Sequence, residues 1–137
     1  MADVDLKKVV TCFLEYGGRI LILKRGEKVK TYKGKWSAVA GYIEEGERPD
    51  DTARKEISEE VGVGNAKLIA RGAPYEFYDL DLGVVWFVHP YRFAVESNKV
   101  SLDWENVESK WILPEELKLY DTVPMLRESW KRVSRPG

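Results

Sequence analysis

The sequence has very little of the two residue types that most often hold zinc in small proteins. It contains one cysteine, Cys12, and one histidine, His89, among 137 residues. A lone cysteine cannot form an internal disulfide, and a lone histidine gives no support to a histidine-based zinc site or a Ser–His–Asp triad. Both residues lie in apolar stretches, so we expect Cys12 in the core and His89 in a structural role.

The sequence also lacks a marked excess of charge of either sign, and it lacks long apolar runs. The net charge is −1, which argues against a surface for duplex nucleic acid, because proteins that bind duplexes are usually far more basic. Charged residues interrupt the apolar runs, so no segment is predicted to span a membrane. Residues 1–8 lack the apolar stretch of a signal peptide. We therefore expect a cytoplasmic protein that binds neither a membrane nor duplex nucleic acid.

The chain is expected to form a single domain over residues 1–137. It contains no internal repeat, low-complexity tract or linker that would divide it, and its length suffices for a hydrophobic core. Short apolar runs rich in β-branched residues predict strands, and glycines between them predict turns. The predicted strands cover residues 8–15, 19–24, 36–43, 66–70, 75–78, 84–95 and 110–112, and Pro90 suggests an edge strand or a bulge.

Two unequal helices are predicted among these strands. Pro49 fits the first turn of a helix that stops at Gly62. One apolar stripe runs along this helix, made of Ala53, Ile57 and Val61. A helical turn is predicted at residues 114–117 and a terminal helix over residues 122–133, with Thr122 as its N-cap. This pattern indicates an α/β or α+β layered domain.

Three carboxylates gather on the first predicted helix, at Glu56, Glu59 and Glu60. Their i, i+3, i+4 spacing places them within an arc of roughly 100°, beside the apolar stripe. Like charges at this spacing repel each other, and a hard divalent cation would relieve the repulsion because Mg²⁺ and Mn²⁺ prefer oxygen ligands. A solvated acidic helix face is the alternative. The acidic loop at residues 44–47, which leads into this helix, favours the metal site.

The spacing around these carboxylates resembles the Nudix signature, G-x5-E-x7-R-E-U-x-E-E-x-G-U, in which U is a bulky aliphatic residue. Residues 41–63, GYIEEGERPDDTARKEISEEVGV, match eight of its nine fixed positions. The exception is Lys55, where the family has Arg. Segments at residues 34–36 and 111–117 are also similar to the family. The chain is therefore identified as a member of the Nudix hydrolase superfamily, the MutT-like proteins.

This resemblance implies an α/β Nudix fold, in which a mixed β-sheet is sandwiched between α-helices. It also implies that Glu56, Glu59 and Glu60 bind Mg²⁺ or Mn²⁺ together with the carbonyl of Gly41. Glu47 would orient the loop or hold the metal through water. A metal bound there polarises phosphorus and lowers the pKa of the attacking water, and a nearby carboxylate takes the water's proton.

Two catalytic assignments stay open. The family Arg orients a catalytic Glu through a two-pronged contact that Lys55 cannot reproduce. We therefore expect reduced or retuned activity and not its loss, with Lys55 paired to Glu59 at i, i+4. The general base in the family is either a signature Glu or a Glu from a later loop, and Glu105 and Glu108 are the later candidates. An exposed loop position without a catalytic role is the alternative for each.

A one-sided basic segment precedes the signature. Residues 19–35 carry seven Lys and Arg side chains and one acid. Such a segment beside a metal site would clamp phosphates, and Arg25, directly after a predicted buried strand, is the first candidate, with Lys35 a second. Tyr32 and Trp36 are candidates to stack on a base. A solvated loop and core positions for the aromatic rings are the alternatives.

The predicted function is that of a metal-dependent pyrophosphohydrolase. It would cleave a phosphoanhydride bond of a nucleoside triphosphate, or of a nucleoside diphosphate linked to another moiety, by attack of a metal-activated water. The alternative is a non-catalytic Nudix-fold nucleotide sensor, although such domains usually lose signature carboxylates. An isopentenyl diphosphate isomerase-like enzyme is disfavoured because Cys12 lies far from the signature, and RNA decapping because the chain is not basic. Nudix hydrolases often dimerise, so a homodimer is a further expectation.

Overall fold

Two long strands form the centre of the structure, a computed structural model that describes residues 5–134. β1 (Asp5–Tyr16) and β7 (Val84–Ala94) pair in parallel along their whole length, from Asp5↔Val84 to Glu15↔Ala94. Both are rich in β-branched and aromatic residues, which suit a strand buried on two faces. Their apolar side chains therefore supply core contacts to both sides of the sheet.

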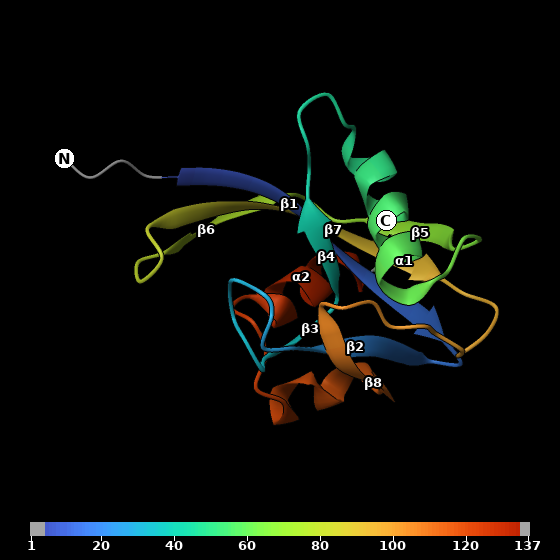
Figure 1. Ribbon diagram of the computed structural model, residues 1–137. Helices are drawn as coiled ribbons and strands as arrows, with labels where there is room; N and C mark the ends of the chain where they lie inside the picture. Colours follow the sequence, from blue (N-terminus) through green and yellow to red (C-terminus); the bar gives the residue numbers. More distant parts are fainter. Residues whose placement is uncertain (1–4, 135–137) are drawn as a thin grey trace.

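Six further strands complete one mixed sheet around this pair (Figure 1). β2 (Arg19–Arg25) follows β1 across a turn in which Gly17 and Gly18 both have positive φ, of 59° and 79°, as tight hairpin turns require. The other strands are β3 (Trp36–Ser37), β4 (Val39–Tyr42), β5 (Lys67–Arg71), β6 (Tyr75–Asp79) and β8 (Asn106–Ile112). The sheet thus contains every strand that the sequence predicts.

The sheet divides on one side of β1, and this division positions the site. β2 pairs with β1 only near the turn, at Glu15↔Ile20 and Tyr16↔Arg19, whereas β4 pairs with the middle of β1, at residues 9–12. β8 and β3 extend the β2 branch. Figure 1 shows β4 leading toward α1, whereas β2 and β8 lie lower in the view. Residues of both branches, among them Gly41 of β4 and Arg25 of β2, line one cavity.

Helices cover both faces of the central strands (Figure 1). α1 (Pro49–Val61) buries Ala53, Ile57 and Val61 against one face, in a cluster that includes Cys12. α2 (Leu126–Val133) and the 3₁₀ helix η1 (Pro114–Leu119) bury Leu126, Val133 and Leu117 against the other face. This confirms the mixed sheet between helices and the core position of Cys12. None of the helices that the structure describes has the length and apolar character needed to cross a bilayer.

The terminal helix begins later than the sequence predicts, and Thr122 is not its N-cap. Thr122 instead forms an isolated parallel bridge with Trp36, and Val123 N–H donates to the Trp36 carbonyl over 2.9 Å. Pro124 disfavours a helical conformation in the residue before it. α2 starts only after Met125, which has a φ of 68°. An extended pairing with the sheet therefore replaces the predicted first turn.

Pro90 lies in a central strand, so the predicted edge position is wrong. β5 pairs with β7 only as far as Arg71↔Tyr91, and β6 begins at Tyr75↔Val88. Pro90 thus falls where one antiparallel neighbour gives way to the next, and no ladder bond needs its missing N–H. Gly72 crosses this gap and donates its N–H to the Pro90 carbonyl over 2.9 Å.

Gly72 is expected to be essential for stability at this crossing. A Cβ there would lie 2.8 Å from Pro90 Cγ and 2.9 Å from the Arg132 carbonyl oxygen, so Gly72→Ala should lower the free energy of unfolding by about 1–3 kcal/mol. Gly64 is the matched control because its φ is not positive and nothing lies within 4 Å of an added Cβ. Gly64→Ala should leave stability unchanged or raise it by up to about 1 kcal/mol. Urea unfolding measures both, and equal stability of the two variants would contradict the packing argument.

Candidate active site

α1 presents its three carboxylates with graded exposure. Glu60 is 3% exposed, Glu56 is half-buried and Glu59 is exposed. This gradient follows from their arc on the helix, which starts beside the buried Ala53, Ile57 and Val61 stripe and turns toward solvent. The helix itself is fixed by Pro49 in its first turn and by Gly62, whose φ of 74° forms the C-cap.

Glu60 connects α1 with two other parts of the chain. Its Oε2 accepts a hydrogen bond from the Ala40 N–H, and its Oε1 accepts one from Asn106 Nδ2, each over 3.3 Å. Burial, and then the negative charges of Glu105 and Glu56, raise the pKa of the Glu60 carboxyl well above its ordinary value. The buried carboxylate therefore lies among groups that fix its position but do not neutralise its charge.

Glu56 packs directly on the backbone of Gly41. A Cβ at Gly41 would overlap the carboxyl carbon of Glu56, so only glycine allows this approach. Burial raises the pKa of Glu56 to about 7, opposed by a hydrogen bond with Glu60 and assisted by the negative charge of Glu59. The structure thus brings Gly41, Glu56 and Glu60 together, as the sequence predicts.

The donor chemistry of these residues fits a hard divalent cation. Within residues 5–134, no three Asp, Glu, His or Cys side chains are drawn together as a ready-made metal site. The negative charge of Glu56 nevertheless raises the pKa of Glu60, the negative charge of Glu59 raises that of Glu56, and Glu59 is exposed on the same helix. A divalent cation would offset the repulsion between these carboxylates, and all the available donors are oxygen atoms.

Lys55 contacts Glu47 instead of the predicted partner Glu59. Its Nζ donates to Glu47 Oε2 over 2.7 Å. The other carboxylate oxygen of Glu47 accepts from the Glu44 N–H over 2.9 Å and from Thr52 Oγ1 over 3.1 Å. The chain turns at Gly46, which has a φ of 85°, and this turn returns Glu47 to the helix. Glu47 therefore holds the acidic loop against the start of α1.

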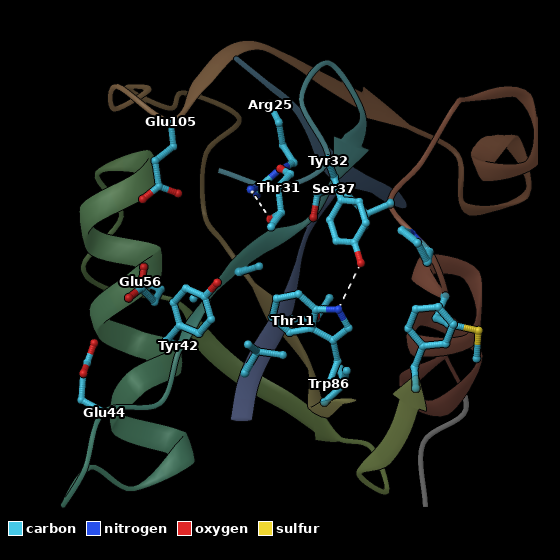
Figure 2. A pocket seen from close by; sticks show the side chains of 18 residues that line it. Thr11, Arg25, Thr31, Tyr32, Ser37, Tyr42, Glu44, Glu56, Trp86 and Glu105 are labelled. Atoms are coloured by element: carbon cyan, nitrogen blue, oxygen red, sulfur yellow. Dashed lines mark hydrogen bonds between the residues drawn. The ribbon is translucent and has the colours of Figure 1, made fainter. Parts of the chain in front are cut away.

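A cavity of about 220 Å³ opens beside these carboxylates. Figure 2 shows Glu56 and Glu105 on one side of it and Tyr32 and Trp86 on the other, with Tyr42 between them. Arg25 also lines the cavity. One space thus combines carboxylates, a guanidinium and aromatic rings, which suits a ligand with an anionic part and a flat apolar part.

Of the two later carboxylates, only Glu105 reaches the cavity. Its N–H donates to Asp103 Oδ1 over 3.1 Å and its carbonyl accepts from the Gly26 N–H over 2.8 Å. Burial, and then the negative charge of Asp103, raise the pKa of Glu105. Glu108 is exposed on β8, opposite Lys24 in the register, and is not among the residues that line the cavity.

The four predicted substrate-binding residues occupy different environments. Arg25 and Tyr32 line the cavity. Lys35 lies outside it and donates to the Asp121 carboxylate over 2.8 Å. Trp36 is 8% exposed in the core, with its ring edge-to-face with Tyr120. The core interpretation is therefore correct for Trp36, because its ring packs in the core cluster that contains Ile20 and Ile22 of β2.

Three aromatic residues of the cavity, Tyr42, Phe77 and Trp86, were not among the candidates from the sequence. Tyr42 and Trp86 stack with ring centroids 6.1 Å apart, and Tyr42 is 46% exposed. Tyr42 directly follows the signature glycine, which is a usable indication of its position. The position of Trp86 depends on the pairing of β7 with β1 and β6, which local sequence does not specify.

Comparison with known proteins bears on the family and the fold. The NUDIX domain family model matches residues 5–132. The nucleoside triphosphatase NudI of Salmonella newport is 26% identical over 126 residues, covering 84% of this chain and 87% of the relative. The MutT protein from Methanosarcina mazei Go1 superimposes with a TM-score of 0.77 at 20% identity, covering 96% and 95% of the two chains. A NUDIX hydrolase from Nitrosomonas europaea superimposes with a TM-score of 0.78 at 17% identity, covering 93% and 88%.

Asn106 is expected to stabilise the protein through its contact with Glu60. Asn106→Ala would leave the buried Glu60 Oε1 without its amide donor, so the free energy of unfolding should fall by about 1–3 kcal/mol when EDTA is present. Asn98→Ala is the control, because that side chain is exposed, and it should change stability by less than about 0.5 kcal/mol. Denaturant unfolding compares the two, and a loss of similar size in both would contradict the assigned role.

Proposed function

The chain belongs to the NUDIX domain family, the Nudix hydrolases, and we propose that it is a pyrophosphohydrolase that depends on Mg²⁺ or Mn²⁺. Its proposed substrate is a nucleoside triphosphate, or a nucleoside diphosphate linked to another moiety, in which it cleaves a phosphoanhydride bond. The observation that carries this proposal is the meeting of Glu56, Arg25 and stacked aromatic rings in one cavity. Nudix hydrolases generally need divalent metal ions, and the carboxylates of α1 supply suitable ligands.

The residues proposed to hold the metal are Glu56, Glu59, Glu60 and the carbonyl of Gly41. A bound divalent ion would neutralise phosphate charge and lower the pKa of an attacking water. Gly41 admits Glu56 to the site because it has no Cβ. Asn106 and the Ala40 N–H hold Glu60, and the Lys55–Glu47 pair keeps the preceding loop in place.

Glu105 is the proposed general base. It lines the same cavity as Glu56, and burial raises its pKa toward the range in which a carboxylate accepts a proton efficiently near neutral pH. Its backbone is held by Asp103 and Gly26, so the side chain extends from a fixed position. A signature glutamate remains the other source of this base.

Arg25 and the aromatic rings are proposed to bind the two ends of the substrate. The Arg25 guanidinium faces the carboxylate side across the cavity and suits a phosphate group. Tyr42 offers an exposed ring for stacking on a nucleobase, and this ring also stacks on Trp86. Because one relative is named a nucleoside triphosphatase, we propose a nucleoside triphosphate ahead of the other nucleotide substrates. We further propose that one domain, spanning at least the matched residues, carries all of these groups.

The deciding experiment is a panel of nucleoside triphosphates and linked diphosphates, assayed for pyrophosphate and phosphate release with Mg²⁺ or Mn²⁺. We expect turnover that EDTA abolishes and that Glu56→Gln lowers at least about 100-fold, because the substitution removes a charged ligand. Glu76→Gln is the control, because Glu76 is exposed on β6. Tight nucleotide binding without turnover on any substrate would replace this proposal with the nucleotide sensor.

The assignment of the general base is tested by comparing variants of Glu105 and Glu108. Glu105→Gln should lower kcat by about 100-fold or more, as loss of a general base does, while KM changes little. Glu108→Gln should leave kcat unchanged, because Glu108 lies outside the cavity on the exposed side of β8. Steady-state kinetics on the best substrate gives both values. Full activity of Glu105→Gln would assign the base to the signature glutamates.

A further inference from the structure

The loop between β2 and β3, residues 26–35, lines the cavity with Thr31 and Tyr32 and has one residue in a strained backbone conformation. This segment, the basic loop, contains Tyr32 with a φ of 52°. Side chains rarely adopt a left-handed backbone, and a bulky residue does so only where surrounding contacts hold it. The other non-glycine residue with positive φ among residues 5–134 is Met125. The conformation of Tyr32 therefore points to contacts that fix this loop.

Those contacts come from the β6–β7 hairpin. The Tyr32 hydroxyl donates to Asp79 Oδ2 over 2.5 Å. It accepts from Trp86 Nε1 over 3.0 Å, as Figure 2 shows. The other oxygen of Asp79 accepts from the Leu82 N–H over 3.2 Å, which fixes Asp79 on the hairpin turn. Burial, and then Asp79, raise the pKa of the Tyr32 phenol, so it stays protonated and keeps donating. We call the hydrogen bonds of the Tyr32 hydroxyl with Asp79 and Trp86 the Tyr32 clamp.

The clamp leads directly to Arg25. Arg25 Nε donates to the Thr31 carbonyl over 3.0 Å, and Arg25 Nη2 donates to Thr31 Oγ1 over 3.4 Å. Thr31 immediately precedes Tyr32, so the backbone conformation of Tyr32 sets the position of the Thr31 carbonyl. The Arg25 N–H also donates to the Lys35 carbonyl over 2.9 Å. The guanidinium is thus oriented by the basic loop and not by the carboxylates across the cavity.

We propose that Tyr32 is a positioning residue, whose clamp to Asp79 and Trp86 holds the basic loop so that Arg25 faces the cavity and binds the anionic part of the substrate. This inference rests on the proposed function of the cavity. It differs from the stacking role that the sequence suggests for Tyr32, because the role proposed here belongs to the hydroxyl, which hydrogen-bonds Asp79 and Trp86, and not to the face of the ring. The clamp should act on substrate binding and leave the chemical step alone.

Tyr32→Phe tests the clamp because it removes both hydrogen bonds and retains the ring. We expect KM to rise about fivefold, the effect of one or two lost hydrogen bonds, with kcat within about twofold of wild type. Asp79→Ala should raise KM similarly, and Asp79→Asn should restore most of the loss because its amide oxygen still accepts from Tyr32. Tyr78→Phe is the matched control, because Tyr78 is half exposed on the same hairpin, and its KM should not change.

A double variant separates positioning from general loosening. If Tyr32 acts through Arg25, Tyr32→Phe should raise KM in the wild-type background but not in an Arg25→Ala background. An equal rise in both backgrounds would overturn the proposal, because Tyr32 would then bind substrate or support the fold independently of Arg25. A fall in kcat with KM unchanged would also overturn it.

Limited trypsin digestion reports on the loop without any turnover. Lys28, Lys30 and Lys33 are exposed in the basic loop, so cleavage there should be several times faster in Tyr32→Phe than in wild type or Tyr78→Phe. Unchanged cleavage would overturn the clamp even in an active enzyme. If wild type hydrolyses no nucleotide, the proposed function fails, and the affinity for ADP replaces KM. An ADP affinity equal in Tyr32→Phe and wild type would then overturn the positioning role separately.

Discussion

The geometry of the site depends on the burial of one carboxylate, that of Glu60. A buried carboxylate is costly unless hydrogen-bond donors surround it, and here the donors come from the chain just before Gly41 and from Asn106. Satisfying Glu60 therefore fixes three segments relative to one another: β4, α1 and the loop that carries Glu105. The Asp103 N–H, which donates to the Glu60 carbonyl over 3.2 Å, strengthens the same junction.

Because the sheet divides at β1, a cavity with two different sides lies next to this junction. On one branch, β4 leads into α1, which holds the carboxylates. On the other branch, β2 ends at Arg25. The cavity lies between the two branches, and Asn106 of β8, on the β2 branch, joins them through its hydrogen bond to Glu60. The negative charge of Glu59 raises the pKa of Glu56, and the negative charges of Glu105 and Glu56 raise the pKa of Glu60. A divalent cation would offset this repulsion.

Local sequence determined α1 and the signature, but not the partners that strand pairing brings to them. Pro49, Gly62 and the apolar stripe act within a few turns of chain, and they define α1 correctly. Trp36 and Thr122 were misplaced as a stacking residue and a helix cap because they bridge each other across 86 positions of sequence. Trp86 reaches the cavity only through the register of β7. Information of that kind resides in long-range pairing, which no local pattern specifies.

Lys55 shows why a departure from the family signature is tolerated here. Arg and Lys differ most where a two-pronged contact is required. In this structure one oxygen of Glu47 is already occupied by the Glu44 N–H and Thr52, and only Oε2 is left for residue 55. A single ammonium donor satisfies that oxygen, whereas a guanidinium fork would compete with the other two donors. The lysine is therefore matched to the way this loop closes on α1, and the loop keeps its place without the family arginine.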